Sequence, residues 1–188
     1  MNISPNEAEQ TLADIQAVMK KNKRLISSSG AYQFLILWGT IWLCGFLCSQ
    51  FIQNQWAGYI WMVLDILGGL LSVYIGIRIG RRVHNASIPS SKRIGAFWGM
   101  LFLFCLAAIL VVQPSDYKQM SMILILFVMI GWSGMSLLFS VVPLKLGVVI
   151  TVLALLGYFF LPNYFFLWMA ILGGGGMIAF GLYIRYRW

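Results

Sequence analysis

Six long runs of mostly apolar, uncharged residues restrict what this chain can fold into. They cover approximately residues 31–51, 57–77, 94–112, 120–142, 146–161 and 165–184. A hydrocarbon layer about 30 Å thick is crossed by about 20 helical residues, because an α-helix rises about 1.5 Å per residue. Hydrophobic residues make up 61% of the chain and charged residues only 10%. We therefore expect an all-α integral membrane protein whose six transmembrane helices form three hairpins.

A transmembrane β-barrel is the competing way to satisfy the backbone in lipid, but its strands would alternate apolar and polar residues. The six runs are continuously apolar, so we exclude it. The fifth run is short, and we expect that helix to tilt little or to begin in the interface. The first thirty residues carry acids and lack an apolar core, so we expect no cleavable signal peptide. The first transmembrane helix then directs insertion.

The distribution of cations predicts the orientation. If the N-terminus is cytoplasmic, then of the 13 Lys and Arg residues only Lys118 lies outside. The positive-inside rule therefore predicts that both termini lie in the cytoplasm. The net charge of +8 reflects this topology and not nucleic-acid binding. Five cations between the second and third spans are expected to contact anionic lipid headgroups: Arg78, Arg81, Arg82, Lys92 and Arg93.

Residues 1–30 form a separate, soluble-looking segment ahead of the transmembrane domain of residues 31–188. Ser4 and Glu7 have the spacing of a capping box, which predicts a helix over about residues 5–26. Five apolar residues form a stripe along this helix, and a membrane surface or a protein must cover it: Ala8, Leu12, Ile15, Met19 and Ile26. One interpretation is an amphipathic helix resting on the inner leaflet, which its basic end favours. The other is a docking helix for a partner or for a second copy.

The three predicted hairpins share a pattern of glycines and aromatic residues. Trp38-Gly39 opens the first and Trp98-Gly99 the second, and the first and third end in YIGIRIGRR and GLYIRYR. These features suggest a triplicated hairpin as a hypothesis. The last hairpin, LGVVITVLALLGYFFLPNYFFLWMAILGGGGMIAFGLYIR, resembles the repeat unit of the HdeD-like six-helix bacterial membrane proteins, which are associated with acid resistance. The chain also resembles small bacterial multipass proteins of uncharacterised role, and these resemblances imply a location in the bacterial inner membrane. Neither resemblance implies a functional residue.

Asp65 is the candidate functional residue, because it stands eight residues into the second span. Helical rise places it about 12 Å below the outer boundary, too deep to reach water easily. An Asp at the centre of a membrane helix costs about 2.5–3.5 kcal/mol on insertion scales. The other spans hold no Lys or Arg to pair with it. We therefore expect a neutral carboxyl that is hydrogen-bonded to neighbouring groups.

Small residues follow Asp65 at spacings of three and then four, and we expect them to share its face and pack against another helix: Gly68, Ser72, Gly76 and Gly80. Asp65 would then point at a helix contact, within this chain or between copies. Two sets of polar residues could partner it: Thr40, Cys44 and Cys48 in the first span, and Ser133, Ser136 and Ser140 in the fourth. Asp65 is then either polar glue between helices or a proton or cation site.

The sixth span holds four successive glycines, residues 173–176. They are not a phosphate loop, because no Lys and Ser or Thr follow them. Ala170, Gly174 and Gly181 instead predict a smooth groove for a neighbouring helix, with the second span as the candidate neighbour. A run of glycines also weakens a helix, so a kink is the alternative interpretation.

Residue combinations typical of enzymes are missing. His84 is the only histidine and falls in the basic loop, so one copy cannot assemble a histidine metal cluster or a Ser-His dyad. The three cysteines lie inside apolar spans without a Cys-x-x-Cys spacing, which indicates packing residues: Cys44, Cys48 and Cys105. We expect no catalytic residues, no metal and no cofactor.

Two functions from different classes remain. The first is a non-catalytic membrane protein with an interaction or regulatory role, which the scarcity of polar residues in the spans favours. The second is a small oligomeric transporter or channel that uses Asp65 as its proton or cation site. The hairpin pattern and the lone acid favour this alternative.

Overall fold

The computed structural model describes residues 10, 30–52, 55–82, 91–139 and 144–187, and every regular element in these residues is helical. The elements are α2 (Ala31–Phe51), α3 (Gln55–Arg82), α4 (Ser91–Val112), α5 (Tyr117–Phe139), α6 (Leu144–Phe160), α7 (Phe165–Trp168), η1 (Met169–Gly175) and α8 (Gly176–Arg187). The all-α prediction is confirmed for this part of the chain. The amphipathic helix predicted over residues 5–26 lies outside the described residues, apart from Gln10.

Five of the described stretches are long and apolar enough to cross a membrane: Tyr32–Phe51, Trp56–Ile79, Arg93–Val112, Tyr117–Leu138 and Phe165–Arg187. The last of these runs through α7, η1 and α8 as one continuous pass. Helix α6 is shorter, and its apolar part is Gly147–Phe160. Its 17 residues rise about 26 Å, slightly less than a hydrocarbon layer of about 30 Å.

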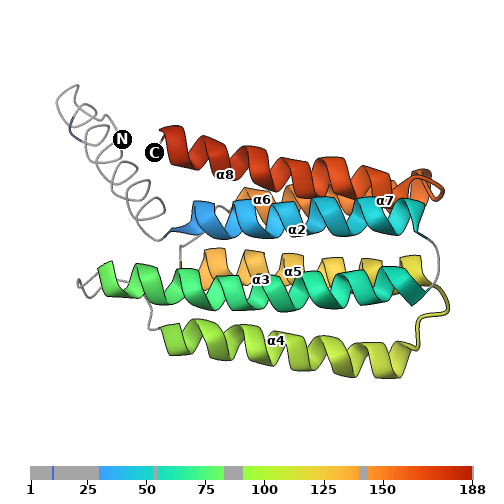
Figure 1. Cartoon of the computed structure of the whole chain (residues 1–188), viewed down its shortest axis with the longest axis horizontal. Coiled ribbons are helices and arrows are strands. Elements are labelled where there is room, and N and C mark those ends of the chain that lie inside the picture. Colours follow the sequence, from blue (N-terminus) through green and yellow to red (C-terminus); the bar gives the residue numbers. More distant parts are fainter. Residues whose placement is uncertain (1–9, 11–29, 53–54, 83–90, 140–143, 188) are drawn as a thin grey trace, which may run out of the picture.

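Successive passes run in opposite directions along one bundle (Figure 1). The start of α2 and the end of α8 therefore lie at the same end, together with the end of α3 and the start of α4. The short connections explain this up-and-down order, because they leave no room for a crossover. Residues 113–116 join α4 to α5, and residues 161–164 join α6 to α7.

The passes are not equally buried. Helix α2 packs on η1, α8 and α3, and α5 packs on α6, which in turn contacts η1. Helix α3 lies against α2, and α4 lies against α5, at the periphery. Only 6% of the apolar stretch of α3, and the same share of α4, is buried, against 39% for α2, α5 and the last pass. The outer faces of α3 and α4 are therefore free of other described helices.

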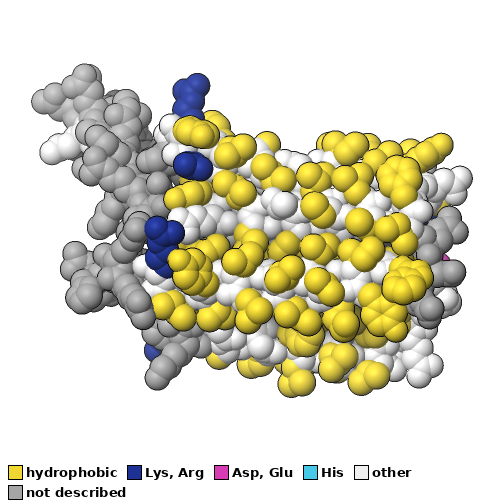
Figure 2. Space-filling view, in the orientation of Figure 1, with side chains coloured by type: hydrophobic (Ala, Val, Ile, Leu, Met, Phe, Trp, Pro, Cys, Tyr) yellow, Lys and Arg dark blue, Asp and Glu magenta, His cyan; other side chains and the backbone are white. Residues whose placement is uncertain are grey.

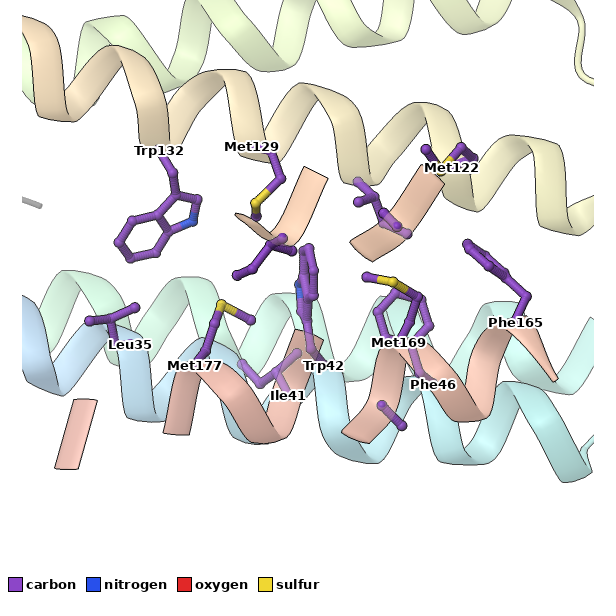
Figure 3. Close-up of a cluster of buried hydrophobic side chains, with 14 of the residues drawn as sticks. Leu35, Ile41, Trp42, Phe46, Met122, Met129, Trp132, Phe165, Met169 and Met177 are labelled. Atoms are coloured by element: carbon purple, nitrogen blue, oxygen red, sulfur yellow. The ribbon is translucent and has the colours of Figure 1, made fainter. Parts of the chain in front are cut away.

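The core lies between α2, α5 and the last pass, and methionines make up much of it (Figure 3). Met129 and Met169 are almost fully buried between aromatic residues such as Trp42 and Phe165. Methionine is unbranched and flexible, so it fills the irregular space between helices that cross at different angles. The same set includes Leu35, Ile41, Phe46, Met122, Ile125, Trp132, Ile150, Ala154, Ala170, Met177 and Ile184.

The surface separates apolar side chains from cations. Hydrophobic side chains cover the flank of the bundle that Figure 2 shows, and Lys and Arg gather at one end of it. Arg78 at the end of α3, Arg93 at the start of α4, and Arg185 and Arg187 at the end of α8 are all exposed. This end is also the one that holds the beginning of α2. The bundle therefore has an apolar belt around its sides and, at one end, a basic rim formed by these four arginines.

Candidate functional site

Asp65 lies on α3 with an exposed side chain, so it is not in a contact with another described helix of this chain, which was one of the two predicted alternatives. Among the described residues its carboxylate makes no hydrogen bond and no ion pair. Its charge does interact electrostatically with Tyr117, at the start of α5. None of the described residues expected as polar partners in the first and fourth spans bonds Asp65, and Ser140 lies outside the described residues. Thr40 donates to the carbonyl of Ile36 in its own helix, at 2.8 Å, and Ser133 lies beside Gly147 of α6.

The small residues that follow Asp65 differ in what they face. Gly68 is buried against α2, where a Cβ would collide with Ile41 and approach Trp38. Ser72 lies at the edge of this contact and accepts a hydrogen bond from Nε1 of Trp38, at 3.1 Å. Gly76 has open space around it. The physical reason is the helical step of about 100° per residue, which makes a spacing of four drift by about 40° each time.

Three of the predicted headgroup-contacting cations lie in helices: Arg81, Arg82 and Lys92. The structure does not describe the surroundings of these side chains or of Gly80. The other two, Arg78 and Arg93, are exposed at the basic end of the bundle. Their position is therefore suited to headgroup contact, because nothing in the described part of the chain covers them.

Gly174 does pack against another helix, but that helix is α2, not the predicted second span, α3. A Cβ on Gly174 would lie 2.5 Å from the backbone nitrogen of Leu43. A Cβ on Gly39 would lie 2.8 Å from the carbonyl oxygen of Gly174, and one on Gly181 would lie 3.1 Å from that of Tyr32. The first and last passes thus approach backbone to backbone along their length, as small residues allow in lipid.

The glycine run also lies in an unusual helical segment. Residues 169–175 form a π-helix, which is wider than an α-helix by about one residue per turn. The backbone continues through Gly176 in ordinary helical geometry, so the last pass stays continuous. Both interpretations of the glycines therefore have a structural counterpart, since close packing and a local change of helix type occur at the same residues.

A hydroxyl cluster at the other end of the bundle was missed by the sequence reasoning. Ser49 of α2 is buried, donates to the carbonyl of Gly45 at 2.9 Å, and accepts from Nε1 of Trp61 of α3 at 2.8 Å. The Tyr117 hydroxyl lies 3.4 Å from the same Ser49 oxygen. Since the Ser49 proton is used by Gly45, Tyr117 is left to donate. Trp61 is one helical turn from Asp65, so the cluster and the acid occupy neighbouring turns of α3.

Gln50 forms a second polar link that the sequence reasoning missed. Its amide nitrogen donates to the carbonyl of Asn163 at 3.0 Å, and its amide oxygen accepts from the backbone nitrogen of Leu167 at 3.1 Å. The side chain therefore joins the end of α2 to the first turn of the last pass. No single spacing in the sequence signals such a link, because the partners are backbone groups.

The described residues contain no group of three or more His, Cys, Asp or Glu side chains that could hold a metal ion. His84 lies outside the described residues. Cys44 is exposed, Cys48 is half-buried and Cys105 is buried, and all three are free thiols. The Asp65 carboxyl has no hydrogen-bond or ion-pair partner among the described residues. The sequence matches no protein-family model and no curated protein, and the fold matches no solved structure.

Proposed function

We propose that this chain is a non-catalytic protein of the bacterial cytoplasmic membrane, with six spans and both termini in the cytoplasm. We infer that it acts by binding another membrane helix. The five long apolar helices, the even number of alternating passes in the described residues and the basic rim support the topology. On this reading α6 completes the six spans, and its short apolar length brings its ends close to the interface.

The single observation that carries the interaction role is the unsatisfied carboxyl of Asp65 on an open helix face. A carboxyl in contact with lipid is costly, and protein groups that bond it recover part of that cost. Helix α3 is a peripheral element whose exposed face can receive a partner without rearranging the core. The basic rim would rest on anionic headgroups and would fix the depth of Asp65 in the bilayer.

Site-specific photo-crosslinking in native membranes tests this role. A photoreactive residue replaces Val73, which is 62% exposed on α3. The matched control replaces Val152, which is 49% exposed on α6. We expect a discrete adduct from position 73 that Asp65→Leu removes, and no such adduct from position 152. Equal labelling at both positions, or an adduct at 73 that does not respond to Asp65→Leu, would contradict the proposal.

A small oligomeric transporter or channel is the second candidate, and the hydroxyls of Ser49 and Tyr117 near Asp65 favour it. An acid beside hydroxyl groups is a common arrangement for proton or cation sites in membranes. Proteoliposomes with an internal pH-sensitive dye test this function directly. Flux of protons or cations that is lost in Asp65→Asn would support it. Infrared difference spectra would show whether the Asp65 carboxyl titrates and responds to a cation.

A further inference from the structure

One face of α3 carries mostly small residues at alternating spacings of four and three. We call this stripe the α3 seam: Gly58, Met62, Asp65, Gly69, Ser72 and Gly76. Alternating spacings of four and three are those of the a and d positions of a heptad, which stay on one side when two helices cross at a small angle. The predicted series with a constant spacing of four drifts by about 40° at each step, whereas the average period of 3.5 in the seam drifts by only about 20° per seven residues.

The structure leaves the seam open. A Cβ built on Gly58, Gly69 or Gly76 meets no heavy atom within 4 Å among the described residues. Met62 is 53% exposed, and Asp65 is also exposed. The remaining member, Ser72, marks the boundary with α2, where it bonds to Trp38. The seam is therefore a continuous strip on which another helix backbone could lie closely.

The seam also contains a group that needs a partner. Asp65 lies near its middle, between Met62 and Gly69, and no described donor or cation bonds it. A polar side chain at a single core position of a helix pair fixes the register of that pair. The occupant of the seam must therefore present a small surface and a hydrogen-bonding group at the depth of Asp65.

We propose that the occupant is a second copy of this chain, bound seam to seam by a twofold axis along the membrane normal. This inference rests on the interaction role proposed above and names its partner. A copy inserted in the same orientation presents each seam residue at the same depth as its counterpart. Glycine then faces glycine, and Asp65 faces Asp65. A protonated carboxyl both donates and accepts, so two of them satisfy each other across the axis.

Cysteine cross-linking of the full-length chain in membranes tests the geometry. The three native cysteines are first replaced: Cys44, Cys48 and Cys105. Single cysteines then enter the seam as Met62→Cys, Gly69→Cys or Gly76→Cys. Each has a control one residue later, off the seam and more than half exposed, as Val63→Cys, Leu70→Cys or Ile77→Cys. We expect the seam variants to form the disulfide dimer about tenfold faster or more, because only they bring Cα atoms within bonding range.

Counting subunits by single-molecule photobleaching in vesicles measures the strength of association. Gly69→Leu should raise the dissociation constant of the dimer about tenfold or more, since it blocks close approach. The matched control is Gly99→Leu on α4, where a side chain also meets open space. Asp65→Leu should weaken the dimer about eightfold, because it removes both hydrogen bonds of the symmetric carboxyl pair, whereas Asp65→Asn should retain the association. Unchanged circular dichroism confirms that the variants fold.

Three results would overturn the second copy as occupant. The chain could be monomeric at every density, the control cysteines could react as fast as the seam cysteines, or the seam could be trapped against a different protein. The third result would leave the interaction role standing with another partner. If the seam traps neither a copy nor another protein, and Asp65→Leu changes no adduct, both proposals fail.

Discussion

Gly174 of the last pass and Leu43 of the first are in backbone contact, since a Cβ built on Gly174 lies 2.5 Å from the Leu43 nitrogen. Helices that approach this closely have no space for even a methyl group. Gly174→Ala should therefore lower the free energy of unfolding by about 1–3 kcal/mol, because the two passes must separate. Thermal unfolding in detergent or lipid discs measures the change.

The control for this substitution is two residues away. A Cβ on Gly176 meets no heavy atom within 4 Å in the described part of the chain. Gly176→Ala should therefore leave stability unchanged or raise it slightly, since alanine restricts the unfolded chain. Equal destabilisation by both substitutions would mean that the glycines matter for helix flexibility and not for close packing.

The hydrogen bond from Trp61 to Ser49 links α3 to α2. Trp61→Phe keeps one aromatic ring but removes the indole donor and part of the packing against the core. It should cost about 0.6 kcal/mol for the hydrogen bond, the average for interhelical bonds in membranes, plus the loss of packing. Trp56→Phe on the same helix is the control, because Trp56 is 63% exposed. A double-mutant cycle with Ser49→Ala measures the coupling. Strictly additive effects would show that the bond contributes nothing.

Gln50 should hold the first turn of the last pass in place. Gln50→Ala removes the acceptor of the Leu167 nitrogen, so amide hydrogen exchange at Leu167 should accelerate. Asn163→Ala is a matched control, because Gln50 bonds the backbone carbonyl of Asn163 and not its side chain. The link would have no structural role if the two variants exchange alike.

The basic rim predicts which end faces the cytoplasm. In a cysteine-free background, Ser115→Cys at the opposite end should react with a membrane-impermeant maleimide in intact cells. Arg187→Cys should react only after permeabilisation. Both positions are exposed, so accessibility to the reagent depends on the side of the membrane alone. The reverse pattern would invert the proposed topology.

Continuous apolar runs predicted the helices well, because length and hydropathy alone determine which segments suit a bilayer. The first predicted span, 31–51, coincides with α2, and the last begins at Phe165 as predicted. The neighbour of Gly174 was predicted wrongly, since a smooth groove indicates close packing but not which helix fills it. Six apolar helices offer many pairings, and only the three-dimensional packing distinguishes them.

The expectation that Gly68 and Asp65 share one helix contact was wrong within this chain, for a different reason. Gly68 and Asp65 are three residues apart, which places them about 60° apart around the helix. That angle is enough for Gly68 to face α2 while Asp65 faces outward. The role of Ser49 was missed because one serine near a helix end is common. Its importance depends on Trp61 and Tyr117, which are far from it in sequence.

The contact between the first and last passes has a consequence for how the protein is made. Helix α2 leaves the ribosome early, whereas the segment around Gly174 is synthesised on the order of ten seconds later. During that interval the narrow strip around Gly39 has no native neighbour and faces lipid or the insertion machinery. A chain that stops before the last pass keeps this strip open. The bundle therefore closes only when synthesis is nearly complete, and the first pass gains its closest neighbour last.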